Sequence, residues 1–95
     1  MASGTINRVS DVKTQTVSNT QSRTISAGSY VSVTIDATLS GYTPIGVVGS
    51  SLTGGAGCAV TESNFDGNSL RLILTNFSSS SRTVSSVSAT VLYKR

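Results

Sequence analysis

Residues 27–50 read AGSYVSVTIDATLSGYTPIGVVGS and contain the clearest strand pattern in the chain. Val31, Val33 and Ile35 alternate with polar neighbours, which is the period-two pattern of a β-strand with one buried and one solvated face. The proline of this stretch lacks a backbone N–H and favours an extended residue before it, so a second strand is expected over Ile45 to Val48. The stretch therefore predicts a β-domain.

Apolar alternation recurs along the rest of the chain, and no window shows the i, i+3, i+4 spacing of a helix. The first of these segments, Val9 to Val17, has no clean apolar face, so it is expected to be an edge or intersubunit strand without an obvious partner in its own chain. The pattern predicts an all-β fold, an antiparallel β-sandwich or jelly-roll-like domain of about seven strands. Residues 23–25 are expected to lead into the central strand, and further strands are expected over residues 58–62, 70–75 and 82–93.

Turn residues separate these segments. A flexible glycine-rich loop is expected over Ser50 to Gly57, a tight turn at Asp66-Gly67, and a hydrophilic hairpin loop over Ser78 to Ser81. Within the last strand, the apolar phase slips at Ser85-Ser86, which predicts a β-bulge. Because that strand runs almost to the last residue, the C-terminus should be tied into the sheet.

A chain of 95 residues forms one domain with a thin core. Residues 1–8 are interpreted as a mobile leader and residues 9–95 as a single β-sandwich domain. Cys58 is the single cysteine, which excludes an internal disulfide and favours a small, mostly buried apolar role. A thin core without disulfides favours oligomerisation. The expected core comprises Ile25, Val31, Val33, Ile35, Ile45, Val47, Leu70, Leu72, Leu74, Val87 and Val91.

Charge and composition exclude several classes of function. Charged residues make up only 12% of the chain, and the net charge of +3 is spread along it without the basic, aromatic-rich patch that nucleic-acid binding requires. There is no signal-peptide pattern and no apolar run long enough for a transmembrane helix, so neither secretion nor membrane insertion is expected. Serine and threonine replace the usual charged surface.

The sequence offers little to catalysis. Because there is no histidine, a Ser-His-Asp arrangement and histidine metal ligation are excluded, and turn or surface roles explain the four carboxylates. Asn64, Asp66 and Asn68 have the oxygen spacing of a calcium loop, but Thr75 stands where that loop requires a glutamate, and a hairpin turn explains the spacing better. We expect no enzyme activity, cofactor or metal.

Three longer stretches together carry a family resemblance: ISAGSYVSVTIDATLSGYTPIGVVGS from Ile25, LRLILTNFSSSSRTVSSVSATV from Leu70, and the terminal VLYKR. Over Ile25 to Arg95 the chain resembles C-terminal domains of phage tail or fibre proteins. The resemblance implies a trimeric β-domain on the virion exterior, synthesised in the host cytoplasm and attached to other virion proteins. Ligand-binding residues do not carry over from such a resemblance.

Three functions follow as expectations. The first is a virion attachment domain, a trimeric fibre tip or tail-associated receptor-binding module, and the second is a purely structural head-fibre or capsid decoration protein. The third is a carbohydrate-binding β-sandwich module outside a virion. A homotrimer is expected, with the N-terminal strand at or near its interface, and a host cell-surface glycan is a candidate ligand. Aromatic and polar candidates for ligand contact are Tyr30, Tyr42, Phe65, Asp66 and Asn68.

Overall fold

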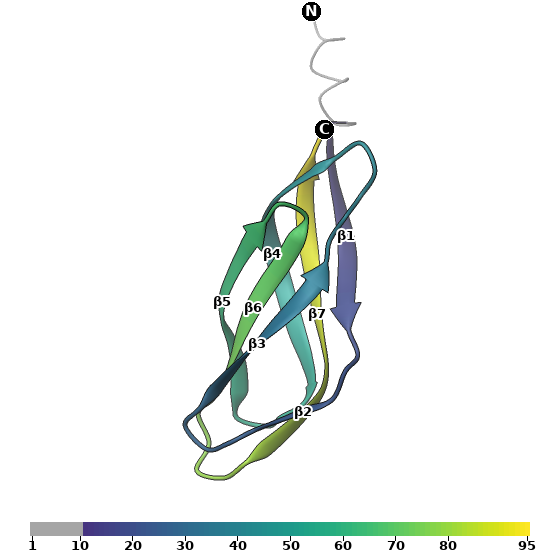
Figure 1. Ribbon diagram of the computed structural model, residues 1–95. Helices are drawn as coiled ribbons and strands as arrows, with labels where there is room; N and C mark the ends of the chain where they lie inside the picture. Colours follow the sequence, from purple (N-terminus) through teal and green to yellow (C-terminus); the bar gives the residue numbers. More distant parts are fainter. Residues whose placement is uncertain (1–10) are drawn as a thin grey trace, which may run out of the picture.

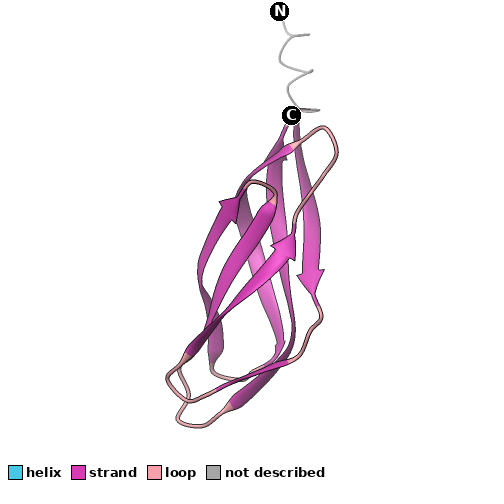
Figure 2. Ribbon diagram, in the orientation of Figure 1, coloured by secondary structure: helices cyan, strands magenta, loops and turns pink. Residues whose placement is uncertain are grey.

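The computed structural model describes residues 11–95, in which every regular element is a β-strand (Figures 1 and 2). Seven strands form two antiparallel sheets, which confirms the predicted all-β fold and is consistent with a β-sandwich. The expected leader, residues 1–8, and the start of the expected N-terminal strand lie outside the described residues. The strands are β1 (Val12–Asn19), β2 (Arg23–Ile25), β3 (Tyr30–Asp36), β4 (Thr43–Gly54), β5 (Cys58–Asp66), β6 (Ser69–Asn76) and β7 (Arg82–Lys94).

The longest strand, β7, organises the first sheet, which we call sheet A. It pairs along one side with β1 and β2 in succession and along the other side with β4. The second sheet, sheet B, has the order β3-β6-β5. The final strand is therefore tied into the sheet, as predicted, and it lies at the centre of sheet A. Within residues 11–95 no helix is long and apolar enough to cross a membrane.

The core lies between the inner faces of the two sheets. Eight of the eleven expected core residues are buried, whereas Val31 and Val47 are half-buried against the core and Ile45 is exposed. Val17, Ala37, Val84, Ala89 and Tyr93 complete the buried apolar set. The confirmed core residues are Ile25, Val33, Ile35, Leu70, Leu72, Leu74, Val87 and Val91.

The prediction that Ile45 is a core residue was wrong because β4 is bulged. Pro44 lies opposite Tyr93 and Gly46 lies opposite Leu92, so Ile45 is an extra residue in the ladder and its side chain is 51% exposed. A second shift leaves Val48 in the same situation, at 60% exposure. Both bulges turn an apolar side chain outward on β4.

The bulge predicted in β7 is confirmed. Thr53 pairs with Ser86 and Gly54 pairs with Val84, which leaves Ser85 as the extra residue. The Ser85 hydroxyl donates to the Thr53 carbonyl at 3.0 Å. Because the bulge restores the phase of the strand, Val84 is buried on the same inner face as the later apolar residues of β7.

The loop predicted over Ser50 to Gly57 is mostly strand. β4 continues to Gly54 because β7 is long enough to offer it partners, and the turn is confined to residues 55–57. Cys58 begins β5 as a free, half-buried thiol, less enclosed than expected.

The N-terminal strand has a partner in its own chain that the sequence pattern did not reveal. β1 pairs with β7 over its whole length, from Val12 opposite Lys94 to Asn19 opposite Val87. Val17, at 8% exposure, is the single buried apolar residue of β1. One buried residue is too few to produce an apolar face that the sequence pattern could reveal. The expected edge position is nevertheless correct, since β1 has no second neighbour in sheet A among the described residues.

The serine-rich segment is not a hairpin loop. β6 belongs to sheet B and β7 belongs to sheet A, so residues 77–81 cross between the two sheets. Asn76 holds this crossing in place. Its side chain is fully buried and its amide donates to the carbonyls of Ile25 in sheet A and Ser80 in the crossing segment. The expected hairpin loop is therefore a connection between the two sheets that is fixed by a buried asparagine side chain.

The sandwich has two dissimilar ends (Figure 1). The terminal pole holds both ends of the described chain, where the Arg95 N–H donates to the Asp11 carbonyl at 2.8 Å, together with residues 37–42 and 66–68. The loop pole holds residues 26–29, 55–57 and 77–81, which are joined by backbone hydrogen bonds such as Phe77 N–H to Gly57 at 3.0 Å.

Candidate functional site

The five candidate ligand residues do not form one site. Tyr42, Asp66 and Asn68 belong to the terminal pole, and Tyr30 begins β3 close to the loop pole. Phe65 is half-buried and packs against the core, so its ring closes the sandwich and is not presented to a ligand. Only Tyr30 stands on an open face of the molecule.

Tyr42 is engaged by two cations. The Nζ atom of Lys13 lies 5.3 Å from the centroid of its ring, and the guanidinium carbon of Arg95 lies 5.0 Å from that centroid. The Arg95 Nη2 also donates to the Tyr42 hydroxyl at 3.0 Å. These contacts tie the last residue to the loop after β3, which is a structural role for a predicted ligand residue.

The calcium-like triad is spread over a strand and a turn. Asn64 and Asp66 lie within β5, and only Asn68 lies in the connection to β6. Gly67 has a φ of 61°, the left-handed value that a glycine supplies at the first central position of a type II′ hairpin turn. Among residues 11–95 no three histidine, cysteine, aspartate or glutamate side chains gather as a metal site.

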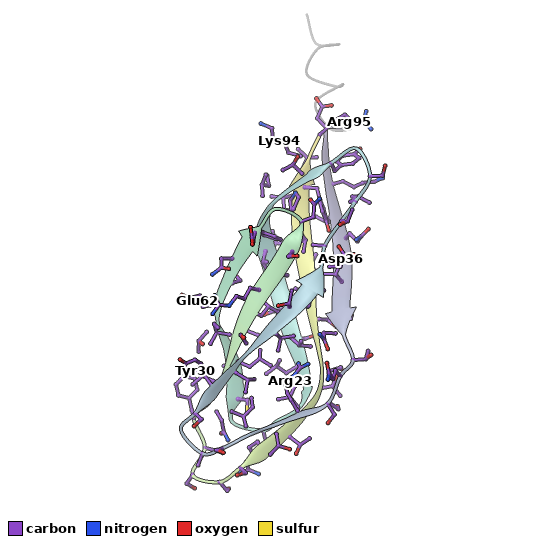
Figure 3. The ribbon with its side chains drawn as sticks, viewed as in Figure 1. Arg23, Tyr30, Asp36, Glu62, Lys94 and Arg95 are labelled. Carbon is purple, nitrogen blue, oxygen red and sulfur yellow. The ribbon has the colours of Figure 1, made fainter. Side chains whose placement is uncertain are left out.

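Tyr30 borders a shallow hollow on the outer face of sheet B. Its side chain is 67% exposed, and the hollow has a volume of about 390 Å³. All three strands of the sheet contribute, because Tyr30 lies opposite Thr75 of β6, and β6 in turn pairs with β5. Figure 3 shows Tyr30 near the loop pole and Glu62 farther along β5. The hollow is lined by Tyr30, Thr61, Glu62, Arg71, Ile73 and Thr75.

The two charged groups of this hollow are unoccupied. Within the described residues, the side chains of Glu62 and Arg71 form no hydrogen bond or ion pair, and both are exposed. The Thr61 and Thr75 hydroxyls lie 2.8 Å apart and share one hydrogen bond, and the Thr61 hydroxyl also donates to the Ile73 carbonyl at 3.3 Å. An acceptor, a strong donor and two hydroxyls thus surround the same depression beside an exposed aromatic ring.

Sequence reasoning found Tyr30 but missed Glu62, Arg71 and the two threonines. Their proximity depends on strand register: Glu62 lies opposite Ile73, after a bulge that shifts β5 by one residue. The alternation that placed Arg71 on the polar face of its strand was visible in the sequence. The identity of its neighbours was not, because pairing partners lie many residues apart.

A second surface runs along the flank where β4 and β5 lie next to each other, which we call the β4–β5 flank. The two strands belong to different sheets, and each is an outermost strand of its sheet among the described residues. Two hollows of about 360 and 430 Å³ follow this flank. Their apolar lining consists mainly of Val47, Val48, Leu52, Cys58 and Val60.

Comparison with known proteins adds no family. No protein-family model matches the chain, and neither a curated protein nor a solved structure matches it.

Proposed function

We propose that this chain is a phage virion attachment domain, a trimeric fibre-tip or tail-associated module that acts by binding. The observation that carries the proposal is the placement of both ends of the described chain at the terminal pole. A module held through that pole presents the loop pole and the faces of both sheets outward. The resemblance of residues 25–95 to phage tail and fibre domains supports the virion location.

The β4–β5 flank supports self-association. Exposed strand edges are normally protected by charged residues, yet the twelve residues of β4 include none, and the bulges expose Ile45 and Val48 instead. A surface without cations and with few anions does not repel a second copy of itself. This flank is therefore a better candidate interface than the N-terminal strand, which is already paired with β7.

A closed ring of copies would pair the open edge of β4 and the open edge of β5 at the same time. Since β4 and β5 lie on the same flank, β4 of one copy can pair with β5 of the next around a closed axis. Three copies are proposed because the resemblance implies threefold assembly. In such a ring, Val48 becomes covered, whereas Val12 on the β1 edge remains in solvent.

Native mass spectrometry tests this assembly. The purified chain should give about three times its mass of 9.7 kDa at micromolar concentration. Val48→Glu should raise the dissociation constant about a hundredfold, because each copy would bring a buried like charge into the interface. Val12→Glu, at a site of 50% exposure on the opposite edge, is the matched control and should leave the trimer intact. A stable monomer, or dissociation caused by Val12→Glu alone, would contradict the flank assignment.

Immunogold electron microscopy tests the virion location. Antibodies raised against residues 11–95 should label the outside of particles of the phage that carries the gene, at the tail or its fibres. Absence of label from intact particles would refute the proposal.

A second candidate function, head-fibre or capsid decoration, is favoured by the outer face of sheet A. This face carries a row of paired hydroxyls, including Thr16–Thr90 at 3.3 Å, Ser18–Ser88 at 2.9 Å and Thr24–Thr83 at 3.0 Å. Side chains this short permit close packing against a flat partner without burying charge. Gold label confined to the capsid would favour this candidate over the tail.

A further inference from the structure

We propose that the hollow on the outer face of sheet B binds an uncharged pyranose sugar. The inference deepens the proposed binding function and rests on it, since it names the ligand class of a module that acts by binding. It assigns the contacts to Tyr30, Glu62, Arg71 and the hydroxyl pair of Thr61 and Thr75. Thr61 and Glu62 also border the β4–β5 flank, but edge-to-edge strand pairing uses backbone groups and leaves side chains on the outer face of sheet B open to a ligand.

The aromatic platform is Tyr30. Of the three tyrosines, Tyr93 is fully buried and Tyr42 is held by two cations, which leaves Tyr30 as the available ring. An amphipathic ring that is 67% exposed can cover the C–H face of a sugar while its hydroxyl stays in water. Its position at the rim of a hollow distinguishes it from Phe77, which is equally exposed at 68% but lines no part of the hollow.

The polar groups match a ring of hydroxyls. A carboxylate such as Glu62 accepts hydrogen bonds from sugar hydroxyls, and the guanidinium of Arg71 donates to ring or hydroxyl oxygens. Neither group has a partner within residues 11–95, so a ligand would break no existing ion pair between them. All of these side chains project from three hydrogen-bonded strands, which fixes the backbone positions before binding.

Charge selects the ligand class. Glu62 and Arg71 contribute one negative and one positive charge to the hollow, so its net charge is zero. A phosphate or carboxylate ligand would meet Glu62, and a cationic ligand would meet Arg71, whereas a neutral polyol can use both. A volume of about 390 Å³ lies at the small end of ligand sites, which suits one or two sugar rings.

The test is a titration of the full ¹⁵N-labelled chain with methyl glycosides of glucose, galactose, mannose, rhamnose and N-acetylglucosamine, followed by amide chemical shifts. At least one glycoside should shift the amides of residues 30, 61, 62, 71 and 75. Tyr30→Ala and Glu62→Gln should each weaken that binding about tenfold. Phe77→Ala, which removes an aromatic ring of the same exposure outside the hollow, should leave the affinity unchanged.

Shifts that map elsewhere, equal loss in Phe77→Ala, or no shift with any glycoside would overturn the sugar assignment. Methyl phosphate is included as a charged probe, and its preferential binding in the hollow would also overturn it. The virion labelling described above is read independently. Labelled particles without sugar shifts would remove this inference alone, and unlabelled particles would remove the virion function.

Discussion

The two poles close the same sandwich with different chemistry. At the loop pole the segments 26–29, 55–57 and 77–81 contain no charged residue and are joined by backbone hydrogen bonds around one buried amide. At the terminal pole the corresponding groups are tyrosines, cations and carboxylates. Tyr93 donates to the Ala37 carbonyl at 2.6 Å, and the Tyr42 ring contacts the cations of Lys13 and Arg95.

This difference in chemistry predicts which changes destabilise each pole. Buried neutral hydrogen bonds do not titrate and are insensitive to salt. The contribution of the loop pole to stability should therefore change on substitution but not with pH or salt. The terminal pole contains groups whose pKa values are shifted by their surroundings. Hydrogen bonds from the Thr38 hydroxyl and backbone N–H lower the pKa of Asp36, and burial is the main cause that raises the pKa of Tyr93. The terminal pole should therefore respond to pH.

The largest effect is expected from Asn76→Ala at the loop pole. The Asn76 amide donates to the Ile25 and Ser80 carbonyls, both at 2.9 Å, and its oxygen accepts from the backbone and hydroxyl of Ser78. Removing it leaves these groups without a partner, which should lower the free energy of unfolding by about 4 kcal/mol. Urea denaturation measures the loss. Asn64→Ala, on an exposed strand position, is the control, and a loss below about 1 kcal/mol at Asn76 would disprove its anchoring role.

A somewhat smaller effect is expected from Gly55→Ala at the same pole. Gly55 has a φ of 65°, and an added Cβ would lie 2.5 Å from Cγ2 of the buried Val84. Backbone strain and overpacking together should cost about 3 kcal/mol. The matched control is Gly28→Ala, with a φ of 71° but no atom within 4 Å of the added Cβ, which isolates a strain of about 1 kcal/mol. Equal losses in the two variants would show that the close approach to Val84 contributes nothing.

These residues also show what sequence could and could not reveal. Alternation at residues 31–35 and 70–74 predicted two strands of sheet B, because each strand buries one face within its own short segment. The exposure of Ile45 and the burial of Asn76 depend on where distant strands lie, and local pattern does not record that. The same limit hid the hollow: Tyr30 was found as an aromatic, but its polar neighbours come from register across β5 and β6.

The smallest effect is expected at the terminal pole, from Tyr93→Phe. Loss of the hydroxyl leaves the Ala37 carbonyl unsatisfied in the core, which should cost about 1.5 kcal/mol at neutral pH, measured by urea denaturation. Because burial raises the pKa of Tyr93 in the folded state, the unfolded chain loses this proton first as pH rises. The stability gained from the neutral phenol is therefore complete below the ordinary tyrosine pKa of about 10 and is lost as pH rises through the higher folded value.

The alkaline dependence sharpens the comparison between the poles. The unmodified chain should lose stability more steeply above pH ~10 than Tyr93→Phe does, so the two denaturation curves should converge as pH rises. Asn76→Ala should keep the alkaline slope of the unmodified chain, because no titrating group is altered at the loop pole. Absorbance at 295 nm should show a tyrosine transition above the ordinary tyrosine pKa of about 10, and this late transition should be missing in Tyr93→Phe. If the unmodified chain shows no such late transition while it remains folded, the buried phenol does not couple the terminal pole to pH.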